Sequence, residues 1–305
     1  MPGTLIDDWK RTGWWIQPKT AREVMAAIGS IGVYSTGQHF AWRGMSSADY
    51  DLSSSLHRQV GGDEEQLRTA EIEILGRARK WGLGVESTGY VDDLQLLSDL
   101  QHYGIATRLI DFTSNPMTAL WFACQTPKSP ALAKAGLLLA LNTTAWERVA
   151  TVRSRTLTVA DLSDPNGATL RAVLRGATPV IVESPSPNAR LRAQEGFFVT
   201  GPVPERERVN LVHGFELVDT TPFKSLHVPF QPGNPEVLQG ALLNERNAGR
   251  PPKVPFVAVI VSSPLKTKLL RYLEGTYNRS ARTLFPDFAG FKEFDTLVPT
   301  RPGVV

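Results

Sequence analysis

Apolar residues recur at helical spacing in several stretches of the first third of the chain. Over residues 63–81 they fall on one face of a helix, and charged residues occupy the other faces. That face consists of Leu67, Ala70, Ile74 and Ala78. A helix is also predicted at residues 20–29, where a threonine and a glutamate have the spacing of a capping box. Another covers residues 92–103 and ends at Gly104, because glycine readily adopts the left-handed conformation that follows a helix.

Alternating or continuous apolar runs predict strands, and most of them lie in the second half of the chain. Aromatic residues alternate with Ala41 and Arg43 at residues 38–44, which predicts a strand. Further predicted strands cover residues 107–112, 135–141, 179–183, 214–218, 225–230 and 254–262, and residues 190–199 lead into another. Residues 263–273 predict a helix after the last of these strands. Residues 146–175 are predicted to be irregular, and residues 231–252, rich in Pro, Gly and Asn, to be a surface excursion.

The order of these elements indicates the fold class. Helices dominate early and strands late, which is typical of α+β proteins with segregated elements rather than of a doubly wound sheet. We therefore predict helices on a mostly antiparallel sheet. Residues 5–16 carry Trp9, Trp14 and Trp15, and we expect them to form a lid packed on the main body.

Composition supports a folded protein in a reducing compartment. The chain has 305 residues, of which 42% are hydrophobic and 21% charged, so it can bury a true core. The net charge of +3 permits a phosphate-bearing ligand without requiring one. A single cysteine, Cys124, excludes a disulfide framework. Because the first residues lack a signal pattern and no apolar run could span a bilayer, we expect a cytoplasmic protein that does not enter the membrane.

Residues 101–116 place polar side chains in an otherwise apolar segment. The pattern predicts a turn, a buried strand and a helix that Asn115 caps, with Pro116 in its first position. His102 could act as an acid or base and Tyr103 could give an aromatic wall to a planar ring. The alternative is a helix end whose polar groups bind the local backbone.

The strand in this segment carries two charges, Arg108 and Asp111. They fall on opposite faces of the strand, so we do not expect them to pair with each other. For Asp111 we expect a buried structural hydrogen bond to the turn at Ser114 or Asn115, because buried polar groups need partners.

Two further segments offer candidate binding residues. Arg43 ends a predicted strand, and its planar guanidinium suits phosphate or carboxylate, while Gly44 allows close approach of the backbone. The alternative for Arg43 is a surface residue stacked on Trp42. Residues 190–198 form a basic lead-in to a strand, with Arg192 before it and Gln194 and Glu195 at its entry, where an amide or carboxylate easily faces a cleft. An ordinary junction between loop and strand is the alternative.

Metal-ion and nucleophile motifs are absent from the sequence. The five histidines are scattered, without the spacing of a zinc site. Cys124 lies in an apolar helix and is expected to fill the core. No nucleophile elbow, P-loop or dinucleotide-binding glycine pattern occurs. We therefore expect no metal cofactor.

Taken together and in order, these segments resemble the FRG domain family, named for a Phe/Tyr-Arg-Gly motif that is Trp42-Arg43-Gly44 here. The central Gln-His-Tyr-Gly…Thr-Arg-Leu-Leu-Asp-Trp-Thr block of that family is similar to residues 101–113, with Ile110 and Phe112 in place of Leu and Trp. Residues 115–123, 192–198 and 284–290 resemble its later motifs, with Glu195 where glutamine is common. The resemblance implies one domain at residues 20–294, an aromatic extension at 1–19 and a tail at 295–305.

A weaker likeness in layout connects the chain to ADP-ribosyltransferase toxins that modify DNA. It implies a split sheet of the ADP-ribosyltransferase type and NAD as substrate. That enzyme class breaks the nicotinamide–ribose bond through an oxocarbenium-like state, as in glycoside hydrolysis. The resemblance implies that Arg43 holds the phosphates, Tyr103 faces nicotinamide and Glu195 stabilises the developing cation. Gln194 is the reserve for Glu195.

The first hypothesis is therefore an NAD-dependent mono-ADP-ribosyltransferase-like enzyme, acting as a toxin or defence effector on a nucleic-acid or protein acceptor and controlled by an antitoxin or regulatory partner. The second is a non-catalytic nucleotide- or nucleic-acid-binding module in which Arg43, Arg108 and Arg192 form an anion pocket. The third, ranked last, is a metal-dependent nuclease. Its ligands would be His57, His102, Asp111 and Glu183.

Overall fold

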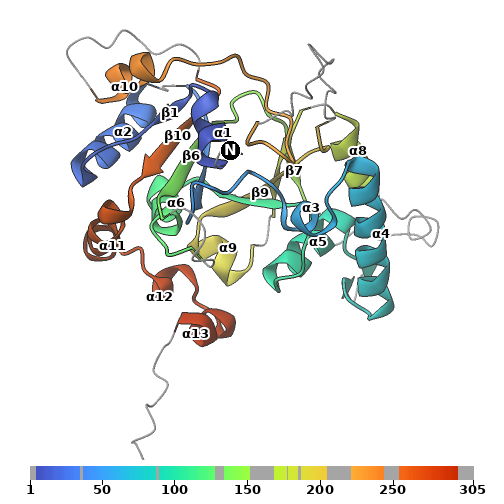
Figure 1. Ribbon diagram of the computed structural model, residues 1–305. Helices are drawn as coiled ribbons and strands as arrows, with labels where there is room; N and C mark the ends of the chain where they lie inside the picture. Colours follow the sequence, from blue (N-terminus) through green and yellow to red (C-terminus); the bar gives the residue numbers. More distant parts are fainter. Residues whose placement is uncertain are drawn as a thin grey trace, which may run out of the picture.

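The computed structural model describes residues 5–34, 37–86, 89–127, 134–151, 168–176, 178–184, 187–204, 221–243 and 254–294. Over these residues the chain forms an eight-stranded mixed sheet and twelve helices (Figure 1). The predicted α+β class is confirmed. The predicted strand at residues 214–218 lies outside the described residues.

The sheet is open and mostly antiparallel. Its strands in spatial order are β1 (Trp15–Ile16), β10 (Phe256–Val261), β6 (Gly136–Asn142), β2 (Phe40–Met45), β5 (Ile110–Thr113), β9 (Gly196–Thr200), β8 (Val180–Glu183) and β7 (Arg148–Ala150). The outermost pair at each edge is parallel, and the neighbours between them are antiparallel. A separate hairpin consists of β3 (Val85–Glu86) and β4 (Gly89–Tyr90).

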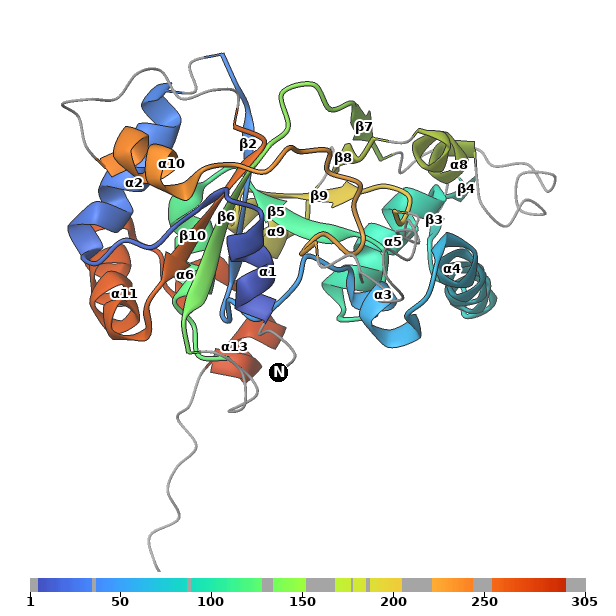
Figure 2. The same ribbon diagram turned by 45° about the horizontal axis from the view of Figure 1, so that its top comes forward.

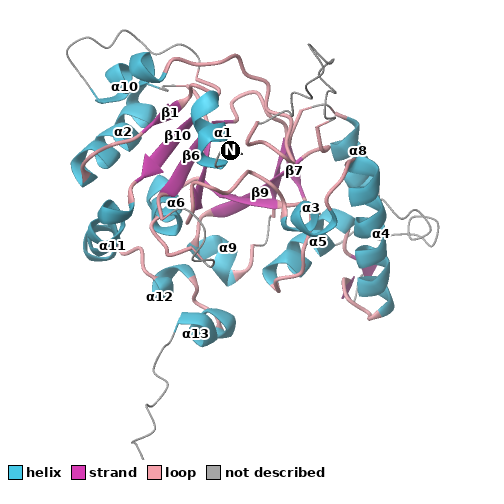
Figure 3. Ribbon diagram, viewed as in Figure 1, coloured by secondary structure: helices cyan, strands magenta, loops and turns pink. Residues whose placement is uncertain are grey.

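The sheet is weakly joined at its centre, between β2 and β5. These strands pair at Trp42 and Thr113, whereas β2 and β6 pair from Phe40 to Met45. Figure 3 shows β6 and β10 running across the direction of β9, so the two halves of the sheet diverge from this point. We call the junction of β2 and β5 the seam.

Helices cover the two halves separately. On one face of the first half lie α2 (Ala21–Tyr34), α6 (Pro116–Ala123), α10 (Pro235–Leu243), α11 (Ser263–Tyr277) and α12 (Ala281–Leu284). The second half packs on α4 (Glu64–Lys80), α5 (Asp93–His102) and α8 (Ala168–Arg175), at the opposite end of the molecule in Figure 2. Shorter helices are α1 (Leu5–Arg11), α3 (Ser55–Val60), α9 (Ala189–Ala193) and α13 (Phe288–Phe294). No helix in the described part of the chain is both long and apolar enough to cross a bilayer.

The central strands are buried on both faces, which explains their continuous apolar sequence. In β6, Leu137, Leu139 and Leu141 pack into the core beneath α1. Leu138 and Ala140 point to the opposite face and pack beneath α2 and α6. Because successive side chains of a strand alternate between faces, a strand between two cores needs apolar residues at every position.

Several predicted helix ends are confirmed. Asp63 caps α4, accepting from Gln66 N at 3.1 Å, and Gly104 follows α5 with φ of 80°. Asn115 caps α6 by accepting from Met117 N at 2.9 Å. Local rules suffice at these ends, because one side chain or one dihedral angle decides where the helix begins or stops.

The N-terminal segment packs on the main body as predicted, but it is an integral part of it rather than a lid. β1 adds an edge strand parallel to β10. Trp9 is fully buried against Phe223 and Phe256, and its Nε1 donates to the carbonyl of Tyr50 at 2.9 Å. A Trp with both an apolar site and a hydrogen-bond acceptor anchors the segment to the core.

Three further predictions fail in whole or in part because tertiary packing overrides local composition. Residues 225–230 pack on the core without forming a strand. The expected surface excursion at 231–252 contains α10, whose buried Leu238 and Leu242 pack in the same core as α2. The segment at 146–175, predicted irregular, includes β7 and α8, and its residues 152–167 lie outside the described residues.

Candidate functional site

A cleft of about 360 Å³ opens at the seam. β2, β5 and β9 supply one part of its lining, and the end of α5, α6, α9 and the segment after α12 supply the rest. Its main polar side chains are Arg43, Gln101, His102, Asp111, Arg190 and Gln194. Phe122, Phe198 and Phe285 add aromatic surface. Its size is within the range of small-molecule sites, which are concave and combine apolar walls with a few polar groups.

Arg43 joins the two halves of the sheet at this cleft. Its Nη1 donates to the main-chain carbonyl of Asp111 and lies 3.9 Å from the carboxylate of that residue. The guanidinium carbon lies 6.0 Å from the centre of the Phe112 ring. Burial lowers the pKa of Arg43, and Asp111 offsets part of that effect. Its Nε is buried without a hydrogen-bond partner among the described residues.

Gly44 has a structural reason to lack a side chain. A Cβ at this position would lie 1.8 Å from the carbonyl oxygen of Ala119 and 2.6 Å from the nitrogen of Ala123. Gly44 therefore allows α6 to pack closely against β2. The prediction that it lets a ligand reach the backbone is not needed to explain the glycine.

Asp111 faces the cleft instead of the turn that follows it. Its side chain is 62% exposed and accepts from Gln101 Nε2 at 2.9 Å. The predicted buried bond to Ser114 or Asn115 is wrong, since Ser114 N donates to the carbonyl of Glu195 at 3.1 Å. At the seam β5 pairs with β2 only at Thr113, so the edge of β5 beside Asp111 has no strand partner on the β2 side.

Glu195 was expected at the cleft with Gln194 as its reserve, but Gln194 lines the cleft and Glu195 does not. Gln194 lines the cleft, with Nε2 donating to the carbonyl of Leu284 at 3.1 Å. Glu195 has φ of 49°, and its carboxylate lies outside the cleft lining, where it accepts from Arg279 at 2.6 Å and Asn115 at 2.9 Å. It borders a second hollow of about 760 Å³. Arg43 and Glu195 therefore do not line the same cleft.

Of the neighbours His102 and Tyr103, both expected at the site, only His102 lines the cleft. His102 lines the cleft, whereas Tyr103 is 81% exposed at the end of α5, its ring 5.1 Å from the imidazole in an edge-on contact. Tyr103 is not among the residues of the cleft wall. Burial and the nearby charge of Arg190 lower the pKa of His102, and Asp287 and Asp99 partly oppose the shift.

This lowered pKa predicts a stability change with pH. A histidine whose pKa is lowered in the folded protein binds a proton more readily when the chain unfolds, so protonation favours unfolding. The free energy of unfolding should decline as pH falls below 6.5, the ordinary pKa of histidine. His102→Gln should reduce this decline, which denaturant titrations at a series of pH values can measure. An identical pH profile in the variant would contradict the assignment.

Arg190 lines the cleft and pairs with Asp287, which lies outside the cleft lining; the sequence did not predict this pair. Arg190 Nε and Nη2 donate to the two carboxylate oxygens of Asp287 at 2.9 and 2.8 Å. The guanidinium carbon of Arg190 also lies 4.9 Å from the Phe285 ring centre. The signal in the sequence is the Leu-Phe-Pro-Asp motif at 284–287, part of the segment that resembles a late motif of the FRG family.

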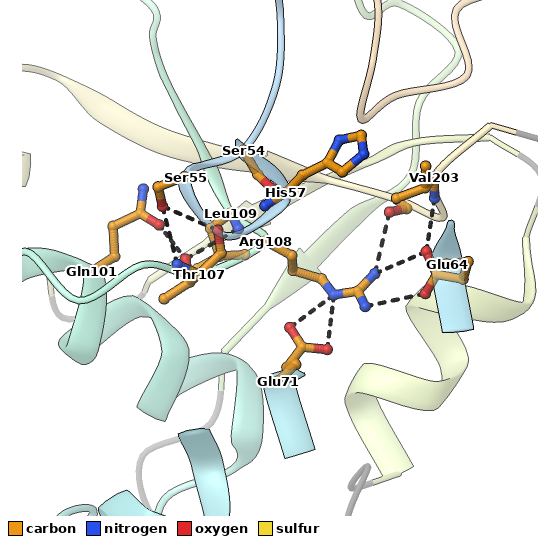
Figure 4. A network of polar contacts seen from close by, with 11 residues as sticks. Ser54, Ser55, His57, Glu64, Glu71, Gln101, Thr107, Arg108, Leu109 and Val203 are labelled. Carbon is orange, nitrogen blue, oxygen red and sulfur yellow. Dashed lines mark hydrogen bonds and ion pairs between the residues drawn. The ribbon is translucent and has the colours of Figure 1, made fainter. Parts of the chain in front are cut away.

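Arg108 and Arg192 do not join Arg43, so the predicted three-arginine anion pocket is wrong. Arg108 is buried and its Nε donates to both oxygens of Glu71 at 2.8 and 2.9 Å, while Nη2 donates to Glu64 at 3.1 Å (Figure 4). Arg192 is exposed and donates to the carbonyl of Pro187 at 3.2 Å. Arg108 is already neutralised by carboxylates of its own chain.

The nuclease site is not assembled either. Within the described ranges, no group of three or more His, Cys, Asp and Glu side chains could hold a metal ion. His57 is buried, with Nδ1 2.7 Å from Ser225 Oγ and Nε2 3.1 Å from the carbonyl of Gly62. Glu183 pairs with Arg148. Cys124 is buried, which raises its pKa to about 12, so it is a core residue as predicted.

Comparison with known proteins gives one match. No curated protein and no solved structure matches the chain. Residues 38–131 match the sequence model of the FRG domain. This region includes β2 with Arg43, the seam, and α6, whereas Arg190, Gln194 and Asp287 lie beyond it. The protein therefore contains an FRG domain.

Proposed function

We propose that the cleft at the seam binds NAD and that the protein is an ADP-ribosyltransferase-like enzyme. The observation that carries this proposal is a pair of buried polar atoms beside the cleft, Arg43 Nε and Thr118 Oγ1, neither of which has a partner among the described residues. A buried donor or acceptor without a partner costs about 1–3 kcal/mol, so such atoms favour a polar ligand that satisfies them.

The side chains around these atoms suit a nucleotide that carries a planar ring. The guanidinium of Arg43 provides donors for a phosphate. Phe122 and Phe285 provide apolar surface against which a nicotinamide ring can pack. Asp111 is the carboxylate among the described residues of the cleft lining.

Asp111 would replace Glu195 in the chemical step. Breaking the nicotinamide–ribose bond leaves positive charge on the ribose, which a nearby carboxylate stabilises. Gln101 Nε2 holds one oxygen of Asp111 at 2.9 Å, which orients the carboxylate while the side chain stays 62% exposed. The acceptor of ADP-ribose would be a nucleic acid or a protein, as expected of a toxin or defence effector that a regulatory partner controls.

Release of nicotinamide from NAD tests the proposal directly. Asp111→Asn should lower the rate of release by about 10²–10³-fold and leave NAD binding largely intact, because the amide keeps a similar shape but not the charge. Glu195→Gln is the matched control, since its carboxylate binds Arg279 and Asn115 away from the cleft lining. Loss of turnover in the control with full turnover in Asp111→Asn would reverse the assignment.

A non-catalytic nucleotide-binding module is the second candidate, and the contacts of Asp111 favour it. The carboxylate is held by Gln101 and lies near the cation of Arg43, so its charge is partly neutralised. This candidate predicts that NAD and ADP bind with an affinity that falls with salt, since the contacts are ionic. It also predicts that no nicotinamide is released with nucleic-acid or protein acceptors.

A further inference from the structure

We propose that Arg190 is a second phosphate-binding residue of the cleft and that the carboxylate of Asp287 competes with the phosphate for Arg190. The inference rests on the proposed nucleotide site and defines its ligand class as a diphosphate. In this scheme the entering diphosphate displaces the Asp287 carboxylate from the two donors of Arg190. The carboxylate thereby sets the affinity of the site.

Arg190 binds the carboxylate of Asp287 with the geometry that an arginine also uses to bind a phosphate. Arg190 presents two parallel donors, Nε and Nη2, to the two oxygens of Asp287 at 2.9 and 2.8 Å. A phosphate offers the same pair of oxygens to an arginine, so one anion can replace the other without a change in the arginine. Both side chains are 21% exposed, so the pair is reachable from solvent.

Arg190 already belongs to the cleft. It lines the same cavity as Arg43, although one lies on α9 and the other on β2. Two guanidinium groups in one small cavity suit two linked phosphates better than one. Thr118, fully buried at the cavity with its hydroxyl unpartnered among the described residues, is an independent sign that a polar ligand belongs there.

Asp287 also ties the wall of the cleft to the chain beyond it. Its segment contributes Phe285 to the cavity, and Gln194 holds the carbonyl of Leu284 at 3.1 Å. The same carboxylate accepts from the nitrogen of Gly290 at 2.7 Å, at the start of α13. An asparagine can keep this contact through its amide oxygen while losing the charge that competes for Arg190.

Calorimetric titration with inorganic pyrophosphate, ADP and AMP tests the inference. Asp287→Asn should tighten pyrophosphate and ADP binding on the order of tenfold, because the competing charge is removed. Arg190→Gln should weaken ADP binding more than AMP binding. Arg192→Gln, two residues away and outside the cleft, is the matched control and should bind like the wild type. Thermal unfolding of each variant verifies that it is folded.

The outcomes separate this inference from the NAD proposal. Tighter pyrophosphate binding in Asp287→Asn without any binding of NAD supports the competitor role and overturns the NAD proposal. NAD binding that neither Asp287→Asn nor Arg190→Gln alters overturns the competitor role alone. Failure of wild type and Asp287→Asn to bind any of the diphosphates overturns both.

Discussion

Replacing Arg108 with methionine is expected to lower the free energy of unfolding by about 3–5 kcal/mol, because it removes the cation from a buried pair. Arg108 and Glu71 are each 1% exposed. Burial raises the pKa of Glu71, and Arg108 is the group that most opposes this shift. Without the guanidinium, the carboxylate must stay charged in the core or take up a proton.

The loss should depend on pH in a defined direction. In the variant, Glu71 has a raised pKa in the folded state and an ordinary one, near 4.5, when unfolded. The folded state then binds more protons, so the variant should lose stability as pH rises above that value. Urea titrations from about pH 5 to about pH 8 should therefore show a growing gap between variant and wild type.

A double variant distinguishes charge from packing. Arg108→Met combined with Glu71→Leu should recover most of the lost stability, since both buried charges are gone and apolar side chains fill their space. Glu64 can stay charged because its side chain is 27% exposed and accepts from Val203 N at 2.8 Å. A double variant as unstable as the single one would show that the geometry of Arg108, rather than charge balance, holds this region together.

The same pair shows what could be predicted from sequence. The helix at 63–81 was identified correctly, and the face named for it included Leu67 and Ala78, which are buried. Glu71, also buried, was not included, because apolar spacing marks a carboxylate as solvent-facing. Its partner Arg108 lies 37 residues further along the chain. No local pattern connects the two positions.

The candidate site likewise has residues that local sequence signals identify and contacts that depend on distant parts of the chain. His102 was found because the end of a helix carries a local signal. Arg43 also lies at the cleft, although its strand does not end there and continues to Met45. The separation of Gln194 from Glu195 was not found, since it depends on the positive φ of one residue. Arg190 and its partner Asp287 are 97 residues apart in the sequence, and Arg43 reaches Asp111 only across the seam, 68 residues away. Pairing over such separations is a non-local property.

Gly44→Ala is expected to be the most damaging small substitution at the seam. The new methyl group would overlap the carbonyl oxygen of Ala119 at 1.8 Å, and backbone cannot move aside as a flexible side chain can. Overpacking costs about 1–3 kcal/mol in ordinary cores and more where the backbone must shift. We expect a loss of about 3 kcal/mol or more, measured by thermal or urea unfolding.

Gly76→Ala is the matched control, because it adds the same methyl group where it meets nothing within 4 Å, on an exposed position of α4. Removing a helical glycine there should stabilise the protein by about 0.5–1 kcal/mol. Opposite signs for one chemical change would locate the effect of Gly44→Ala in the contact between β2 and α6. That contact places Arg43 and Thr118 beside the same cavity, so Gly44→Ala should also weaken nucleotide binding in whatever fraction still folds. A stable Gly44→Ala protein with unchanged binding would mean that α6 can withdraw from the strand without disturbing the cleft.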